Sequence, residues 1–139
     1  MNKKIYIANW KMNLNVKEAN NYFDDFFSIY KDSPDKEVVF CPSFTTLFSV
    51  SNKFSKFKKI SFGAQNVSHF KEGAQTGEIS VNMLNELLCK YCIVGHSERR
   101  NNYQETDDLI NKKIKKLMAK NIVPILCVGE SYEARKNNM

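Results

Sequence analysis

Hydrophobic and polar residues recur along this chain with two periods, one typical of strands and one typical of helices. Short apolar runs predict strands at 4–9, 37–41, 60–64, 91–95 and 122–129. Between the first two runs, apolar residues follow helical spacing and form one stripe on an otherwise polar helix: Val16, Ala19, Tyr22, Phe23, Phe26, Phe27 and Tyr30. Further helices are expected after Pro42, over 81–90, from Ser97, after the N-cap candidate Thr106 and from 131 onward.

The succession of strand and helix predicts an α/β fold built on a parallel sheet. Runs this apolar are typical of strands that are buried on both faces. Pro124 lies inside the fifth run and lacks a backbone donor, so we expect the hydrogen bonds of that strand to begin after it. Since no linker or low-complexity segment divides the chain, residues 1–139 are expected to form a single domain.

Composition places the chain among globular proteins. The 139 residues are 42% hydrophobic and 26% charged, which is enough apolar material for one buried core. The apolar stretch that follows the basic start stops at Trp10, too early for the core of a signal peptide. Since no run is long enough to span a bilayer either, we expect a soluble cytoplasmic protein without a membrane partner.

A formal net charge of +6 raises the possibility of nucleic-acid binding. However, only three of the 21 positive residues are Arg, and the lysines are scattered along the chain. Stripes of Arg or of interleaved aromatic residues, which are the better indicators of such binding, are absent from the sequence. We therefore expect no nucleic-acid partner.

Cys89 and Cys92 form a C-x-x-C pair, which can indicate a metal or redox site. A structural zinc site needs four ligands, but no second pair with suitable spacing follows, and His69 and His96 are isolated. We favour a packing role, with Cys89 closing a helix and Cys92 lying in the next strand as small buried apolar groups.

Polar and charged motifs follow the predicted strands. They read ANWKMN (8–13), GAQNV (63–67), GAQTGE (73–78), VGHSERR (94–100) and LCVGE (126–130). In their order and spacing these five motifs closely resemble the triosephosphate isomerase family. The resemblance implies a (β/α)8 TIM barrel, of which only about the first five strands are present in this chain.

The positions of the motifs agree with that architecture on physical grounds. In a (β/α)8 barrel the active site is built from the loops that leave the carboxyl ends of the strands. The resemblance further implies the reaction. Dihydroxyacetone phosphate and D-glyceraldehyde 3-phosphate are interconverted by proton transfer through an enediolate, a step of glycolysis and gluconeogenesis that uses no cofactor or metal.

Site roles come from the resemblance, one residue at a time. His96 matches the electrophile of the family, a neutral imidazole that polarises the substrate carbonyl from a helix N-terminus. Lys11 matches the lysine that holds the phosphate and stabilises developing negative charge. Asn9 matches a side-chain donor to the same oxygens, and Glu98 is expected to position Lys11 and the start of the helix.

Supporting roles are expected for three further residues. Ser97 is a candidate cap of the helix that follows His96. Cys127 matches a buried residue that packs behind the site, and Glu130 is a candidate supporting or helix-start carboxylate. Arg99 and Arg100 are expected to bridge to carboxylates of neighbouring loops.

The polar segment 65–80 is too long for a simple turn, and long loops inside compact domains are usually functional. By resemblance, Gln65 and Asn66 begin a loop whose tip, at Thr76, reaches into a partner subunit near its catalytic residues. This implies a homodimer when the protein is full length.

Two parts of the family's machinery have no counterpart in the sequence. These are the catalytic glutamate after the sixth strand and the glycine-rich phosphate loops after the seventh and eighth. Without a general base, residues 1–139 are expected to be an inactive fragment of the isomerase. The alternative is a non-catalytic half-barrel or assembly module.

Overall fold

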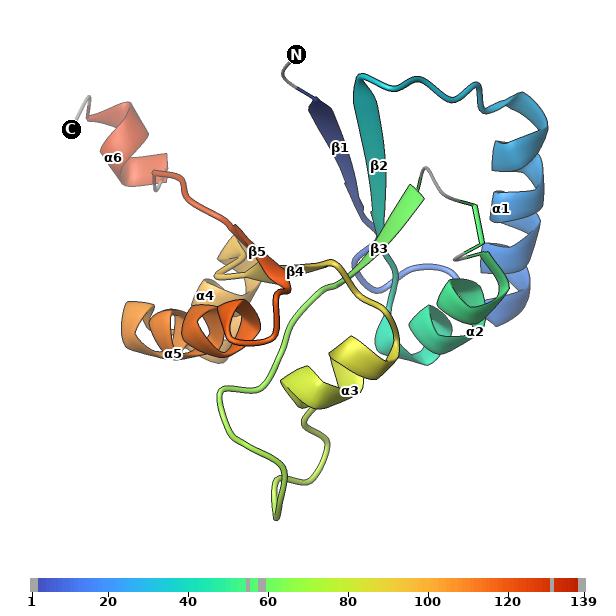
Figure 1. Ribbon diagram of the computed structural model, residues 1–139. Helices are drawn as coiled ribbons and strands as arrows, with labels where there is room; N and C mark the ends of the chain where they lie inside the picture. Colours follow the sequence, from blue (N-terminus) through green and yellow to red (C-terminus); the bar gives the residue numbers. More distant parts are fainter. Residues whose placement is uncertain (1–2, 55, 58–59, 131, 138–139) are drawn as a thin grey trace.

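The computed structural model of the chain is a curled parallel sheet with helices around it (Figure 1). It describes residues 3–54, 56–57, 60–130 and 132–137. The strands are β1 (Lys4–Asn9), β2 (Lys36–Cys41), β3 (Ile60–Ala64), β4 (Tyr91–Val94) and β5 (Val123–Leu126). The helices are α1 (Val16–Ile29), α2 (Phe44–Phe54), α3 (Val81–Glu86), α4 (Ser97–Tyr103), α5 (Asp107–Met118) and α6 (Tyr132–Lys136).

The strands pair in their sequence order, β1-β2-β3-β4-β5, and every neighbouring pair is parallel. Each strand is followed by a helix; those after β1 to β4 lie around the sheet, whereas α6, after β5, stands apart from it (Figure 1). This confirms the α/β class and agrees with the first five strands of a (β/α)8 barrel. Among the described residues, no helix is both long and apolar enough to cross a membrane.

The main core lies between the sheet and its helices. Phe23 of α1 is fully buried, and its ring lies 4.9 Å from the ring of Phe40 and 4.7 Å from that of Phe54. A smaller apolar cluster lies on the other face of the sheet and centres on Val39, Cys41 and Ile93. The stripe read from the sequence is thus confirmed in part. Ala19 and Phe23 are buried, and Phe26 and Phe27 pack against the core, whereas Val16 and Tyr22 are exposed and Tyr30 is the C-cap of the helix.

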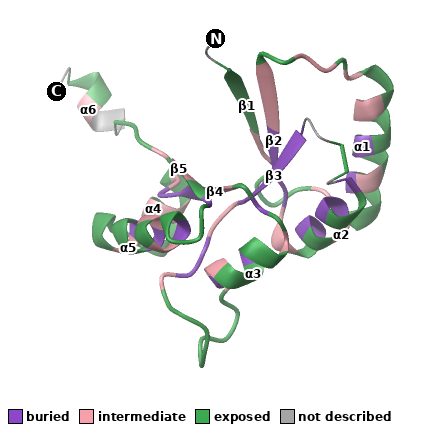
Figure 2. Cartoon of the chain, in the orientation of Figure 1, coloured by how far each residue is buried: buried purple, intermediate pink, exposed green. Residues whose placement is uncertain are grey.

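Burial on both faces, which the sequence predicts for every strand, holds for β3 but is wrong for β1 and β5. All five residues of β3 are buried, whereas Ile5 is 48%, Ile7 is 42% and Leu126 is 46% exposed. Within these 139 residues, β1 and β5 are the two edges of the sheet, and each has a single neighbour. Figure 2 shows this contrast, with β3 buried and β1 exposed.

Two predicted elements are shorter in the structure. The helix expected over 81–90 ends at Glu86, because Leu88 takes a left-handed conformation (φ 57°) that turns the chain back to the sheet. The strand expected over 122–129 covers only Val123–Leu126. Cys89 and Cys92 are buried, as expected for packing, and desolvation raises the pKa of Cys89 to about 12.

Pro124 does not delay the hydrogen bonding of β5, contrary to expectation. The N–H of Val123 donates to Lys90 O (2.8 Å), and that of Cys127 donates to Val94 O (3.0 Å). In a parallel strand, alternate residues direct their N–H groups toward the same neighbour. Pro124 falls between two such residues, so its missing donor faces away from β4.

A buried ionic cluster joins the segment after α4 to α5. Glu105 Oε1 accepts hydrogen bonds from Lys113 Nζ and from Arg99 Nε (2.6 Å), and Lys113 Nζ also donates to Asn66 Oδ1 (2.8 Å). The side chains of Glu105 and Lys113 are each only 5% exposed. Burial alone would raise the pKa of Glu105, but the hydrogen bonds from Lys113 and Arg99 outweigh it and lower the pKa.

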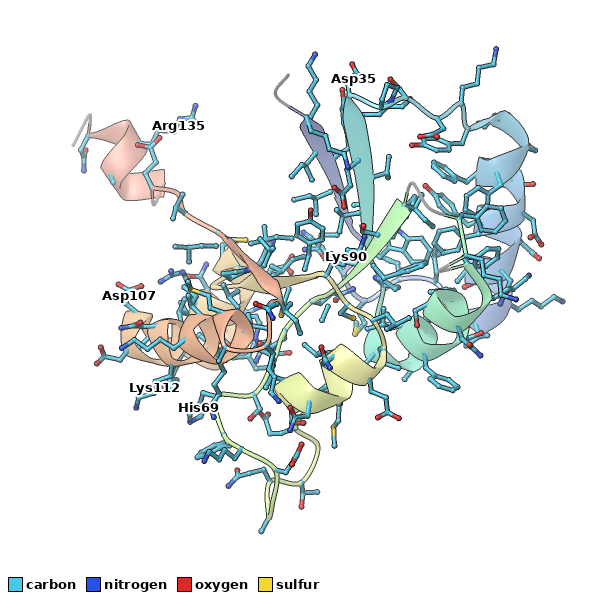
Figure 3. All side chains as sticks on the ribbon, in the orientation of Figure 1. Asp35, His69, Lys90, Asp107, Lys112 and Arg135 are labelled. Atoms are coloured by element: carbon cyan, nitrogen blue, oxygen red, sulfur yellow. The ribbon has the colours of Figure 1, made fainter. Side chains whose placement is uncertain are left out.

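Replacing Lys113 is expected to destabilise the protein, because Lys113→Met leaves the Glu105 carboxylate buried beside Arg99 alone. Breaking a buried pair costs ~3–5 kcal/mol of unfolding free energy. Urea denaturation measures this cost, and Lys112→Met is the matched control, since Lys112 is exposed on the same helix (Figure 3). Equal midpoints for the two variants would contradict a stabilising role for the cluster.

The cluster also gives stability a pH dependence of known sign. Because the pKa of Glu105 is lowered in the folded protein, its contribution is present above the unfolded pKa and is lost as pH falls through the folded one. Denaturation curves across the acid range should therefore show that the free energy of unfolding decreases as the pH decreases. In the Lys113→Met variant, the part of this pH dependence that comes from Glu105 should be lost. An unchanged slope in the variant would contradict the assignment.

Candidate active site

Lys11 follows β1 by two residues and has an unusual backbone conformation. Its φ is 53°, in the left-handed region, which costs an L residue ~1–2 kcal/mol. Two side chains hold this conformation. Asn9 Oδ1 accepts from the Lys11 backbone N–H (3.0 Å), and Gln65 Nε2 donates to the Lys11 carbonyl (2.8 Å).

The Lys11 ammonium forms an ion pair with Glu98, as expected from the sequence. Nζ lies 2.7 Å from Glu98 Oε1, and both side chains are about half exposed. The hydrogen bond from Lys11 lowers the pKa of Glu98, and the nearby charge acts in the same direction. Solvent-exposed pairs add little to stability, so we interpret this contact as one that aims the lysine.

His96 caps the helix that follows it, and Ser97 does not. Ser97 is the first residue of α4, while the N-cap is His96, whose Nδ1 accepts from the Glu98 backbone N–H (3.3 Å). The expectation that Ser97 caps this helix is therefore wrong. The same Nδ1 lies 3.4 Å from Glu98 Oε2, so Glu98 contacts this edge of the ring through both its backbone and its side chain.

Two hollows meet at His96. The first, of about 510 Å³, is lined by Asn9, Lys11, Gln65, His96 and Glu98, together with residues of α4 and the loop after β1. The second, of about 850 Å³, is lined by His96, Ser97, Cys127 and Glu130, among others. The structure therefore brings Asn9, Lys11 and His96 together and places Cys127 and Glu130 on the far side of the histidine.

Cys127 and Glu130 are more open than the sequence suggests. Cys127 packs against the cluster of Val39, Cys41 and Ile93, as expected for a packing role, but it is partly buried where a buried residue was expected. Its place one residue beyond the edge strand β5 explains the exposure. Glu130 lies 3.6 Å from Arg135 Nε of α6, an exposed pair beside the start of that helix.

Both arginines of the VGHSERR motif bridge to carboxylates, as expected. Arg99 reaches Glu105, and Arg100 reaches Asp107 Oδ1 (2.7 Å) while its Nε donates to Gly95 O (2.7 Å). Gly95 has a φ of 68°, and a Cβ there would lie 2.9 Å from Ile110 Cδ1. Glycine is therefore required at the turn that leads into His96.

The long loop between β3 and α3 projects away from the sheet (Figure 1). Its stem is closed by the bond from Ser68 N to Ile79 O (2.8 Å), and Thr76 is exposed near its tip. Its first two residues, however, face the body of the protein. Gln65 contacts Lys11, and Asn66 accepts from Lys113.

Gln65 also lines the site, although the sequence assigns it to the dimer loop alone. The signal that could have found it is its place as the first residue after β3. Residues at that position in a parallel sheet lie at the same edge as Lys11 and His96.

The parallel sheet, covered on its outside by helices and with polar groups at the carboxyl ends of its strands, agrees with the first part of a (β/α)8 barrel. The sequence profile described as Triosephosphate isomerase matches residues 4–139. The chain belongs to the triosephosphate isomerase family, and thus to a family of isomerases.

Individual relatives agree. A triosephosphate isomerase of Dictyoglomus thermophilum is 48% identical over 136 residues, which cover 98% of this chain and 54% of the relative. That of Aquifex aeolicus is 45% identical over 137 residues, covering 99% and 55%. That of Clostridium botulinum (Loch Maree) is 46% identical over 140 residues, covering 100% and 55%. The chain thus spans about half the length of the curated relatives it matches.

Removing the lysine should release the carboxylate it holds. In Lys11→Met, the pKa of Glu98 is expected to rise, because the hydrogen bond that favours the ionised form is lost. Carbon-detected NMR titration of the side-chain carboxyls measures the shift. Asp35 is the internal control, since the Ser33 hydroxyl and its own backbone are the main causes that lower its pKa. An unchanged pKa of Glu98 in the Lys11→Met variant would contradict the ion pair.

Proposed function

We propose that this chain supplies the electrophile and the phosphate clamp of a triosephosphate isomerase, which interconverts dihydroxyacetone phosphate and D-glyceraldehyde 3-phosphate. The observation that supports it best is the pocket in which Asn9, Lys11 and His96 meet. An enediolate intermediate carries negative charge on an oxygen next to the reacting carbon. Such a charge is stabilised by fixed donors and cations placed before the reaction begins.

Each of the three residues has a chemical task in this proposal. His96 donates a hydrogen bond from Nε2 to the substrate carbonyl and so polarises it, since Nδ1 is the ring nitrogen that Glu98 contacts. The ammonium of Lys11 binds the phosphate and the oxygens that become negative. Asn9 aligns Lys11 by accepting from its backbone N–H, and its amide nitrogen remains available as a donor.

The general base belongs to a part of the protein outside these 139 residues. Within the described part of the pocket the carboxylate is that of Glu98, which is paired with Lys11 and has a lowered pKa. A carboxylate of lowered pKa is a weak base and is poorly suited to removing a carbon-bound proton. Since the chain spans about half of its relatives, their other half is where the base is expected.

The reaction moves a proton and leaves the oxidation state of the whole substrate unchanged, so the proposal involves no cofactor. A role in glycolysis and gluconeogenesis, and with it a cytoplasmic location, follows from this substrate pair. We further propose that the full-length protein is a homodimer, with the loop around Thr76 entering the partner subunit. The loop's projection from the sheet supports this (Figure 1).

The electrophile is tested by His96→Gln in the full-length protein that contains this chain. Removing a donor to a developing oxyanion is expected to lower kcat ~10²–10³-fold. The coupled assay of glyceraldehyde 3-phosphate formation measures the loss. His69→Gln is the matched control, because the His69 ring contacts Phe70 in the long loop and is not among the residues that line the two hollows at His96. Full activity in the His96 variant would refute its role.

Residues 1–139 alone are expected to show negligible turnover in the same assay, whereas the full-length protein should be active. Loss of a general base alone costs ~10²–10⁴-fold. Activity of the short chain near that of the full-length protein would show that a base lies within it. An inactive full-length protein would favour the non-catalytic module instead.

The dimer is tested at the loop tip. Thr76→Arg in the full-length protein is expected to shift the dimer toward monomer, because a long charged side chain would have to enter the partner's pocket. Sedimentation velocity across a dilution series measures the change. Lys71→Arg, at an exposed position of the same loop, is the control. Equal dissociation constants for the two variants would count against this interface.

A further inference from the structure

Gln65 uses both hydrogens of its side-chain amide on backbone carbonyls of two other strand ends. Its Nε2 lies 2.8 Å from Lys11 O and 2.8 Å from Cys41 O. Lys11 follows β1, Cys41 ends β2, and Gln65 itself follows β3. One amide group therefore ties together the carboxyl ends of three consecutive strands.

The second of these acceptors is already fixed in place. Cys41 is fully buried, and its carbonyl also accepts from the backbone N–H of Trp10 (3.1 Å). A carbonyl has two lone pairs and can accept both bonds. The Gln65 amide is thus anchored on a rigid, buried strand end, and its remaining hydrogen is directed at a residue that is not buried.

That residue is Lys11, whose backbone conformation needs support. A left-handed φ is unfavourable for a side chain with a Cβ, and it persists only where the surroundings hold it. Asn9 holds the N–H side of Lys11, and Gln65 holds the carbonyl side. If the carbonyl were free, the peptide could relax toward an extended conformation, and the direction of the lysine side chain would change with it.

We propose that Gln65 is a positioning residue, which locks the strained backbone of Lys11 so that its ammonium reaches Glu98 and the pocket shared with His96. The catalytic part of this inference rests on the proposed function; the structural part does not. No catalytic contact of Gln65 with the substrate is required. Its effect on the reaction passes through Lys11.

The proposal makes a specific demand on the side chain at position 65. Only a donor with two hydrogens at this reach can serve both carbonyls. Gln65→Glu keeps the shape but offers two carboxylate oxygens to two carbonyl oxygens, so both bonds are lost. Gln65→Ala removes the group altogether, and the two variants should therefore behave alike.

The test is a double-mutant cycle in the full-length protein, with Gln65→Ala, Lys11→Met and the double variant. Displacing a catalytic group by about 1 Å can cost ~10²-fold, so Gln65→Ala is expected to lower kcat/KM by about that factor. In the Lys11→Met background the same change should have little further effect, because it acts through the missing lysine. Inhibition by inorganic phosphate should weaken in Gln65→Ala as well.

Asn20→Ala is the matched control. Its amide also donates to a backbone carbonyl, that of Val16 (2.7 Å), but on the exposed face of α1. It should keep the wild-type kcat/KM and phosphate inhibition. Losses in Gln65→Ala that add fully to those of Lys11→Met would show that Gln65 acts independently of the lysine and would overturn the proposal.

A readout that needs no catalysis separates this inference from the proposed function. If Gln65 aims Lys11 at Glu98, then Gln65→Ala should raise the pKa of Glu98, as Lys11→Met does. NMR titration of the side-chain carboxyls measures this pKa. If the wild-type protein proves inactive but this shift occurs, the function fails and the positioning role stands. An unchanged pKa of Glu98 in folded Gln65→Ala protein would overturn the positioning role.

Discussion

Parallel pairing of the strands is the constraint on which the rest of the structure depends. Because all five strands run the same way, their carboxyl ends meet at one edge of the sheet. Residues that are far apart in sequence, such as Asn9, Gln65 and His96, thereby come to line one pocket. The loops supply the chemistry, and the register of the sheet fixes where each loop begins.

Stability and chemistry are carried by different groups. The core is built from aromatic and aliphatic side chains around Phe23. In the described part of the chain, Glu105 and Lys113 form a strongly buried ionic contact that borders the pocket through their partners Arg99 and Asn66. The ion pair in the site, between Lys11 and Glu98, is half exposed and adds little to stability. Lys11 can therefore exchange its partner Glu98 for an anionic ligand at a small cost in free energy. The Lys11 backbone, by contrast, is strained and is held by Asn9 and Gln65.

Much of this arrangement could be predicted from the sequence, because it depends on local patterns. The existence and order of the strands, the centre of the α1 stripe and the Thr106 cap follow from periodicity and capping chemistry, and the structure confirms them. The partners of Lys11, Arg99 and Arg100 could be anticipated in kind, since charged residues at strand ends seek opposite charges.

What the sequence could not provide depends on three-dimensional geometry. The exposure of β1 and β5 follows from their being the edges of the sheet within these 139 residues, and an apolar run such as KIYIA carries no sign of that. Whether Pro124 interrupts β5 depends on which neighbour each N–H faces. The helix cap is His96 and not the expected Ser97, because α4 begins one residue earlier than the sequence suggests. The double role of the Gln65 amide appears only when three strand ends are seen together.

The central claim is that Lys11 and His96 act together on one phosphorylated substrate, with Gln65 holding the lysine in place. A crystal structure of the full-length protein with 2-phosphoglycolate, whose carboxylate resembles an enediolate, tests it most directly. We predict that Lys11 Nζ and His96 Nε2 both hydrogen-bond this ligand while Gln65 remains bonded to the Lys11 carbonyl. A ligand bound elsewhere, or a Lys11 that is extended and released from Gln65 in the complex, would contradict the account.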